Sequence, residues 1–261
     1  MGKQRAALRD YLSVVDLEPL NTTALHKSAD ISFNLPDHPR LPLVLKNLTH
    51  ASKLLPENLK IKNDLGYAYY LQGHYDLARG VFLALSEVDA TKEDPVFHSA
   101  VLSNLAYSLA ETGHVGKAVE MLRESIKLDP KIFQARIKLA KILGSKRFGQ
   151  TEEAMKILEA LVSEGYNDAS IHSALGRIAF ESENLNEAAS WFVKSISSEQ
   201  SNPKHHASLA NTYTQMDRNF KAASHYFRAF WLSRGAENRV YHLLSMLVAL
   251  AVGMRIVKQD K

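Results

Sequence analysis

The sequence predicts an all-α protein, an α-solenoid built from antiparallel helix pairs. The first observation is that a leucine followed by a small residue recurs five times, 34 to 40 residues apart. The second is that an alanine follows each pair at a nearly constant distance, with a large residue four positions later. Positions four apart share one face of a helix, so each unit is expected to contain two helices packed on each other.

The aligned positions have a direct physical meaning. A small residue lets the first helix of a unit approach the second closely, and we expect the large residue to fill the gap between one helix pair and the next. The leucine–small pairs are Leu65-Gly66, Leu105-Ala106, Leu139-Ala140, Leu175-Gly176 and Leu209-Ala210. The alanines are Ala78, Ala118, Ala154, Ala188 and Ala222. The large residues are Phe82, Leu122, Leu158, Phe192 and Tyr226.

This pattern resembles the tetratricopeptide repeat, a 34-residue helix–turn–helix unit with the motif W-x2-L-G-x2-Y…A-x3-F…P. The resemblance implies a right-handed superhelix of antiparallel helix pairs that acts as a scaffold and not as an enzyme. Pro130 ends the second helix of its unit, as the motif requires. The five expected units are 59–98, 99–132, 133–168, 169–202 and 203–236. The consensus tryptophan is absent, and its positions hold Lys62, Leu102, Arg136, His172 and His206.

Two units depart from the regular length. The first carries about six extra residues, 89–95, which we expect to form an exposed loop. The third carries two extra residues within 144–149, which lengthen the turn between its helices.

Two further elements precede the five units. Residues 1–20 have the spacing of the second helix of a unit, and we expect either a native capping helix or, with slight preference, the remnant of a truncated repeat. The residues with that spacing are Ala7, Tyr11, Val14 and Pro19. Residues 21–58 are a degenerate repeat, with one helix over 22–34, a turn over 36–42 that contains three prolines, and a second helix that ends at Leu55.

The C-terminal segment, residues 237–261, is expected to form a closing helix. Its stretch 243–252 is apolar on nearly every face but is shorter than the ~20 apolar residues of a membrane span. A terminal cap normally has a polar outer face. Either the helix is buried against another element, or residues 240–257 dock a partner, a second copy of the chain, or further chain.

The sequence contains no catalytic motif, and we expect no catalytic residue, no metal site and no cofactor. Cysteine is absent, which excludes disulfides and thiolate chemistry. No nucleotide-binding loop, nucleophile elbow or zinc-protease motif is present. His205 and His206, with His172 one repeat upstream, could form a metal pair, but partly buried histidines with satisfied hydrogen bonds are expected instead. His74 and His114 are expected to be exposed caps in the turns between helices.

The remaining candidate is the concave groove, which the first helices line in this repeat class. Outward positions next to the leucine–small pairs predict an aromatic and amide-lined first half and a cationic second half. Tyrosines supply contact area and a hydroxyl, and Lys and Arg receive carboxylates. The predicted groove residues are Asn63, Tyr67, Tyr70, Ser103, Tyr107, Lys138, Lys141, Arg177, Phe180 and Asn211. Ile137, Ser173 and Ala207 stand at the positions equivalent to Asn63 and Ser103.

One subfamily of these repeats grips acidic chaperone C-termini with a two-carboxylate clamp. The equivalent positions here hold Asn63, Tyr67, Asn104, Gln134 and Lys138, of which Asn104 fits and Lys138 half fits. That ligand is therefore not expected. The 32 Lys and Arg residues are interleaved with 28 Asp and Glu residues, which is typical of solvated helix faces and not of nucleic-acid binding.

The sequence thus predicts a scaffold or adapter that holds a protein or peptide segment with acidic and apolar residues, without a transmembrane span. Two alternatives remain, a self-associating homodimer module and an appendage of a larger enzyme. The repeats are also similar to those of bacterial proteins that assist tight-adherence (Flp-type) pilus assembly, which would imply an envelope or secretion role. The compartment stays open, either cytoplasmic or, if an upstream signal has been removed, the bacterial envelope.

Overall fold

The computed structural model describes residues 2–35, 38–89, 94–145, 147–233 and 235–259, with side chains up to Met254. These residues form fourteen α-helices and no strand, which confirms the predicted all-α class. Two compact units divide the chain, residues 1–135 and residues 136–261. Each unit is described by itself below.

Unit 1 is made of seven helices and the start of an eighth. They are α1 (Gly2–Leu17), α2 (Thr22–Asn34), α3 (Leu41–Leu54), α4 (Leu59–Leu71), α5 (Tyr75–Ser86), α6 (Pro95–Glu111) and α7 (Val115–Leu128). Consecutive helices pack on each other, and α2 also contacts α4. Three helices of unit 1 begin with a side-chain N-cap. Asn21, Asn58 and Asp94 each accept a hydrogen bond from a backbone N–H in the first turn of the following helix.

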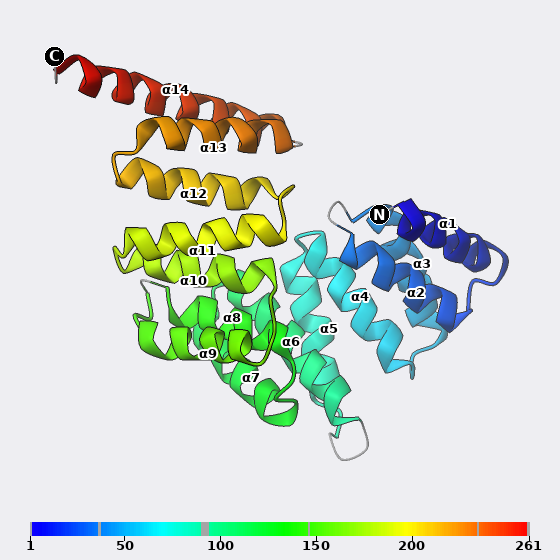
Figure 1. The fold of residues 1–261 in the computed structure, drawn as a ribbon. Helices are drawn as coiled ribbons and strands as arrows, with labels where there is room; N and C mark the ends of the chain where they lie inside the picture. Colours follow the sequence, from blue (N-terminus) through cyan, green and yellow to red (C-terminus); the bar gives the residue numbers. More distant parts are fainter. Residues whose placement is uncertain (1, 36–37, 90–93, 146, 234, 260–261) are drawn as a thin grey trace. The chain divides into compact units, whose positions relative to one another are not determined.

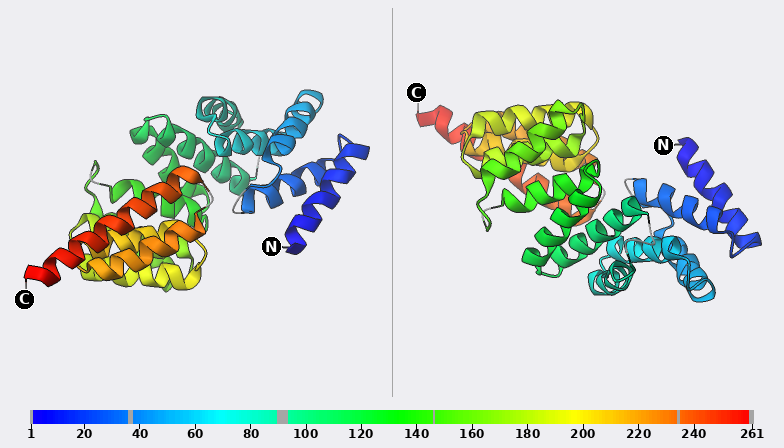
Figure 2. Two further views of the ribbon diagram at one scale, coloured as in Figure 1. Left: turned by 90° about the horizontal axis from the view of Figure 1, so that it is seen from above. Right: turned by 90° about the horizontal axis from the view of Figure 1, so that it is seen from below.

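Unit 2 continues with α8, which begins at the end of unit 1, and six more helices. They are α8 (Phe133–Leu143), α9 (Thr151–Ser163), α10 (Ala169–Glu181), α11 (Leu185–Ser198), α12 (Pro203–Gln215), α13 (Asn219–Leu232) and α14 (Ala236–Gln259). The helices α10 to α14 lie side by side in chain order, with α14 outermost (Figures 1 and 2). The described residues contain no helix long and apolar enough to cross a membrane.

The repeated small and large positions form the core of the helix pairs. All five alanines of the second helices are fully buried, and the five large residues are at most 5% exposed. A Cβ built on Gly66 would lie 2.8 Å from the Phe82 ring, and one on Gly176 would lie 2.9 Å from the Phe192 ring. The close approach predicted from the small residues is therefore confirmed.

The large residues also contact the first helix of their own pair. Phe82 and Phe192 lie against the glycine of their own helix pair, because a glycine leaves a depression that the ring of the partner helix occupies. Phe192 also shares a buried cluster with Leu209 of α12, in the gap to the next pair that the sequence pattern predicted it to fill.

Buried serines form hydrogen bonds between helices, which the sequence analysis did not predict. Ser99 of α6 donates to the carbonyl of Ser125 in α7 at 2.9 Å, and Ser125 donates back to the carbonyl of Ser99 at 2.8 Å. Ser195 of α11 donates in the same way to the carbonyl of Ala169 in α10. All three serines are buried, and the hydrogen bonds leave none of their hydroxyls unpaired where the two helices pack closely.

The ends of the predicted elements need small corrections. Pro42, predicted in a turn, lies in the first turn of α3, and Pro95 begins α6, because proline at that position gives up no helical hydrogen bond. Helix α1 buries Leu8, Leu12 and Val15. Each of these residues comes one position after a residue of the predicted pattern, Ala7, Tyr11 and Val14, so the buried face is shifted by one residue. Most of the loop predicted over 89–95 lies outside the described residues.

Candidate partner-binding surfaces

A concave pocket of about 270 Å³ lies in unit 1 between the first helices of successive pairs. Its walls come from α2, α4 and α6 and from the segment around the start of α8. The lining residues are Phe33, Asn63, Asp64, Tyr67, Ala100, Ser103, Asn104, Tyr107, Ile132 and Gln134. Four predicted groove residues, Asn63, Tyr67, Ser103 and Tyr107, are therefore brought together here.

An amide pair lines this pocket. Asn104 Nδ2 donates to Asn63 Oδ1 at 3.1 Å, which fixes the orientation of both side chains. Among the described residues, neither the remaining Asn63 Nδ2 donor nor the Asn104 Oδ1 acceptor has a partner. A donor and an acceptor side by side match the N–H and C=O groups of an extended peptide.

A chain of tyrosines continues from the pocket along α4. Tyr67 meets Phe33 edge-on at 5.1 Å between ring centroids and stacks on Tyr70 at 5.9 Å. Tyr70 in turn lies 6.2 Å from Tyr107. Burial raises the pKa of Tyr107 to about 12, and it raises the pKa values of Tyr67 and Tyr70 as well. These phenols therefore stay neutral and serve as apolar walls with hydroxyl tips.

The same pocket contains a buried carboxylate that the sequence analysis did not identify. Asp64 is 6% exposed, and His26 of α2 lies 2.7 Å away through Nδ1. The hydrogen bond to Asp64 raises the pKa of His26, and burial raises the pKa of Asp64. Asp64 directly precedes the Leu65-Gly66 pair, which the repeat pattern assigns to the core. An acidic residue next to these core positions is the sequence feature from which a buried carboxylate could have been predicted.

Unit 2 carries a group of cations around Lys141 of α8. Burial, together with the nearby charges of Arg177, Lys138 and Lys204, lowers the pKa of Lys141 to about 8. The guanidinium of Arg177 donates to the carbonyl of Lys141 at 3.1 Å, which holds the two residues next to each other. Among the described residues, Lys141, Arg177 and Lys204 form no ion pair with a carboxylate. Asp168 only partly offsets the repulsion.

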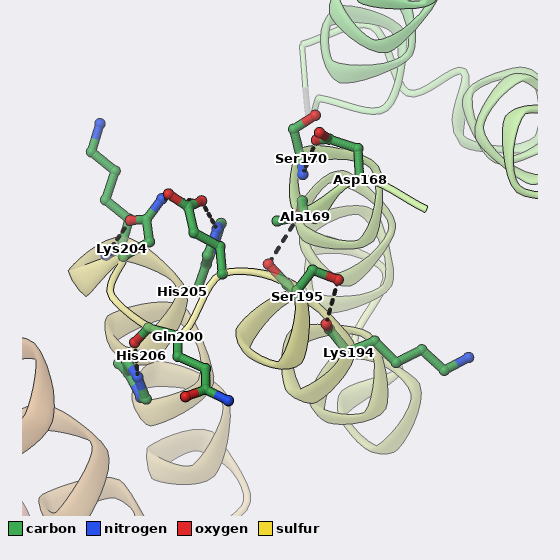
Figure 3. A network of polar contacts seen from close by, with 12 residues as sticks. Asp168, Ala169, Ser170, Lys194, Ser195, Gln200, Lys204, His205 and His206 are labelled. Carbon is green, nitrogen blue, oxygen red and sulfur yellow. Dashed lines mark hydrogen bonds and ion pairs between the residues drawn. The ribbon is translucent and has the colours of Figure 1, made fainter. Parts of the chain in front are cut away.

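A second pocket, of about 490 Å³, opens beside Lys141. It is lined by the starts of α10 and α12 and the end of α11, and Figure 3 shows the polar contacts around it. Asp168 accepts from the backbone of Ser170, and Asn202 accepts from the backbone of Lys204, so both helix starts are capped. Lys204, which the sequence analysis did not select, joins the predicted Lys141 in this lining.

The three histidines are buried, but only part of the prediction for them holds. His172, His205 and His206 are at most 6% exposed, yet the Nδ1 atoms of His172 and His205 have no hydrogen-bond partner among the described residues, so these two rings are not fully satisfied. His172 stacks on Trp191 at 5.7 Å, and His206 stacks on His225 at 5.5 Å. His74 and His114 are exposed and stand at the starts of α5 and α7, but their rings make no capping hydrogen bond, contrary to the expected role.

Several predicted groove residues present little surface. Ser103 is 3% exposed although it lines the pocket of unit 1, and Ile137 is 5% exposed, so neither presents much of the outward surface predicted for its position. Phe180 packs beside the core around Phe192. Asn211 accepts a 2.6 Å hydrogen bond from the Tyr226 hydroxyl, which supports the α12–α13 pair.

Comparison with known proteins agrees with this architecture. Family models described as tetratricopeptide repeat match residues 99–132 and 146–203. The photosystem I assembly protein Ycf3 of Acaryochloris marina is 32% identical over 113 residues, which is 41% of this chain and 66% of that protein. The alignment therefore leaves a third of that relative uncovered.

Solved structures share the fold. A tetratricopeptide repeat protein from Parabacteroides merdae has a TM-score of 0.71 at 16% identity, covering 94% of this chain and 93% of its own. A thermophilic protein of the same repeat class from Thermus thermophilus has a TM-score of 0.62 at 22% identity, covering 72% and 99%. Proteins of this class generally mediate protein–protein interactions and are generally not enzymes. Residues 99–132 and 146–203 are thus similar to tetratricopeptide repeats.

Proposed function

We propose that this chain is an interaction scaffold that holds an extended polypeptide segment with acidic and apolar residues. The observation that carries the proposal is the group of cations around Lys141. The pKa of the Lys141 ammonium is lowered by burial and by three neighbouring cations, and the group has no carboxylate partner among the described residues, so an incoming anion is favoured. A carboxylate of a partner protein would supply the missing charge.

The pocket of unit 1 supports the other half of this specificity. The Asn63–Asn104 pair offers one donor and one acceptor to a peptide backbone, and Tyr67 and Tyr107 offer apolar walls. Backbone recognition by amides tolerates many sequences, whereas the tyrosine walls select apolar side chains. We therefore propose that unit 1 binds backbone and apolar groups and that unit 2 binds acidic groups.

The similarity to an assembly protein favours a client that is being assembled into a larger complex. The pilus and secretion setting finds no support among the relatives described above and stays a sequence-based prediction. The predicted groove residues and repeat boundaries are likewise proposals.

The test begins with an array of short peptides that vary independently in acidic and apolar content, followed by fluorescence anisotropy on the strongest binder. Arg177→Glu should weaken binding of an acidic peptide at least ~10-fold, because it reverses a charge next to Lys141. The matched control is Lys156→Glu on α9, the same charge change at an exposed position away from this pocket. It should change the affinity less than ~2-fold.

The pH dependence of binding gives a second readout. Because the pKa of Lys141 lies near 8, affinity for the acidic peptide should fall as the pH rises through that value, and Lys141→Met should abolish the inflection. Equal affinities for acidic and neutral peptides, or equal effects of the Arg177 and Lys156 variants, would refute the proposal.

A further inference from the structure

We propose that the outer face of α14 binds a second copy of this chain in an antiparallel, two-fold symmetric dimer. This inference concerns the C-terminal end of unit 2 and does not depend on the proposed client-binding function. It starts from the two faces of α14.

The inner face of α14 packs against α13. His242, Ala249 and Gly253 are buried there, and a Cβ on Gly253 would lie 3.2 Å from the Cβ of Asn219. This face accounts for the position of the helix at the end of the stack in Figure 1. Among the described residues of unit 2, α14 makes its main contacts with α13, and the opposite half of the helix is exposed.

The outer face is apolar from Val240 to Met254. No Asp, Glu, Lys or Arg occurs between Val240 and Met254. Val240, Leu244, Leu247, Ala251 and Met254, here called the α14 seam, follow one another at spacings of four, three, four and three residues. All five are exposed, the four larger ones by 51% to 58%. This alternation is the heptad spacing with which one helix packs along another in a coiled coil.

An aromatic stripe on α13 extends this surface. Phe220, Phe227 and Trp231 are 54%, 49% and 63% exposed. Phe220 lies beside Gly253, and Trp231 lies near Arg239, so the stripe runs alongside α14 from one end to the other. The seam, its apolar neighbours and the stripe together offer roughly 1,000 Å² of exposed apolar side chain, more than the ~800 Å² per partner of a standard interface.

The composition of this surface favours a second copy over another protein. Interfaces between proteins that also exist apart are about as polar as ordinary surface, whereas homodimer interfaces are more apolar. The seam itself carries no charge, so a second apolar seam matches it, and each copy of the chain provides one at equal concentration. In an isologous dimer the same face of both copies forms the contact.

Side-chain size sets the direction of the pairing. A parallel pair would place Ala251 opposite Ala251 and leave a gap in the seam. An antiparallel pair with its two-fold axis beside Leu247 places Leu244 close to Ala251 of the second copy and Val240 close to Met254. The helix dipoles then also oppose each other.

The oligomeric state of the full chain tests the proposal. Light scattering after size exclusion should give twice the mass of one chain. Leu247→Glu should give a monomer and weaken self-association at least ~100-fold, since it puts a charge on the two-fold axis. The substituted side chain is half exposed, so the fold is preserved, which circular dichroism checks. Val193→Glu on α11, at a similarly exposed apolar position, should leave the dimer intact.

The absence of cysteine allows a direct test of geometry. Under oxidation, Leu247→Cys should cross-link to itself, because the axis brings the two Cβ atoms within disulfide range. Val240→Cys should cross-link to a separately made Met254→Cys chain but not to itself.

Three results would overturn the proposal. One is a wild-type chain that remains monomeric at high micromolar concentration. Another is a Leu247→Glu chain that remains dimeric. The third is a monomeric wild-type chain that floats with phosphatidylglycerol-containing vesicles and loses this binding in Leu247→Glu, which would assign the face to a lipid surface. Self-cross-linking of Val240→Cys would exclude the antiparallel arrangement.

Discussion

The helix pairs α10–α11 and α12–α13 are neighbours in unit 2 and fill equivalent positions, 34 residues apart, in two different ways. The first pair combines Gly176 with Phe192, and the second combines Ala210 with Tyr226. In the first pair His172 stacks on Trp191, whereas in the second His206 stacks on His225.

The difference teaches that the repeat constrains pairs of side chains and not single residues. A bare glycine receives the flat ring of Phe192, which needs no polar partner. Tyr226 lies beside an alanine and is nearly buried, so its hydroxyl needs a partner. It donates a hydrogen bond to Asn211 Oδ1 at 2.6 Å. A buried hydroxyl without that acceptor would be costly.

The largest expected effect is the loss of the ring in the first pair. Phe192→Ala should lower the free energy of unfolding by about 3–5 kcal/mol, because Phe192 is 3% exposed and its removal leaves a cavity. Urea denaturation followed by circular dichroism measures it. Val193→Ala, at the half-exposed neighbouring position, is the control and should cost less than about 1 kcal/mol. A loss below 1 kcal/mol in Phe192→Ala would mean that the ring does not support the pair.

The next effect comes from the glycine itself. Gly176→Ala should destabilise the protein by about 1–3 kcal/mol, although alanine is the better helix former, because the added Cβ meets the Phe192 ring at 2.9 Å. Gly80→Ala on α5 is the matched control, since a Cβ there meets nothing within 4 Å. It should stabilise by about 0.5–1 kcal/mol. The comparison between the pairs fails if both substitutions stabilise.

A smaller effect is expected in the second pair. Tyr226→Phe should cost about 1 kcal/mol, because it removes the hydrogen bond to Asn211 and leaves that amide oxygen without its donor. Tyr241→Phe, at a half-exposed position on α14, serves as the control and should be close to neutral. Thermal unfolding of the two variants side by side gives the difference.

The smallest effect is a pH dependence that comes from the contact between His206 and His225 in the second pair. His206 Nε2 donates to the carbonyl of Gln200, so in the neutral pair its Nδ1 accepts from Nδ1–H of His225 at 3.2 Å. Burial, with the charges of His206 and Arg228, lowers the pKa of His225 to about 4, and burial lowers the pKa of His206 as well.

Because these pKa values are lower in the folded state, the unfolded chain takes up protons first as the pH falls. The contribution of the pair to stability is complete above pH ~6.5 and is lost as the pH falls toward about 4. The loss should be about 1 kcal/mol, since the rings are only partly buried and water screens them. Chemical denaturation between these pH values should show a flatter profile for His225→Phe. Parallel profiles for the two proteins would disprove the assignment.

The sequence by itself determined the helix pairs, because one repeated spacing marks both the helix faces and the points of close approach. Gly66, Gly176 and the five alanines were predicted as core from their positions, and the structure buries all of them. It also predicted that α14 would carry more apolar surface than a terminal cap needs.

Only the tertiary structure decided which outward positions are surface. Ser103 stands at the position equivalent to Asn63 and both line the same pocket, yet Ser103 is buried and Asn63 is only partly buried, because burial depends on how neighbouring helix pairs pack against each other. Asp64, Lys204 and His225 were missed for the same reason. Their roles come from His26, Lys141 and His206, which lie 38, 63 and 19 residues away in the chain, and no local pattern records contacts over such distances.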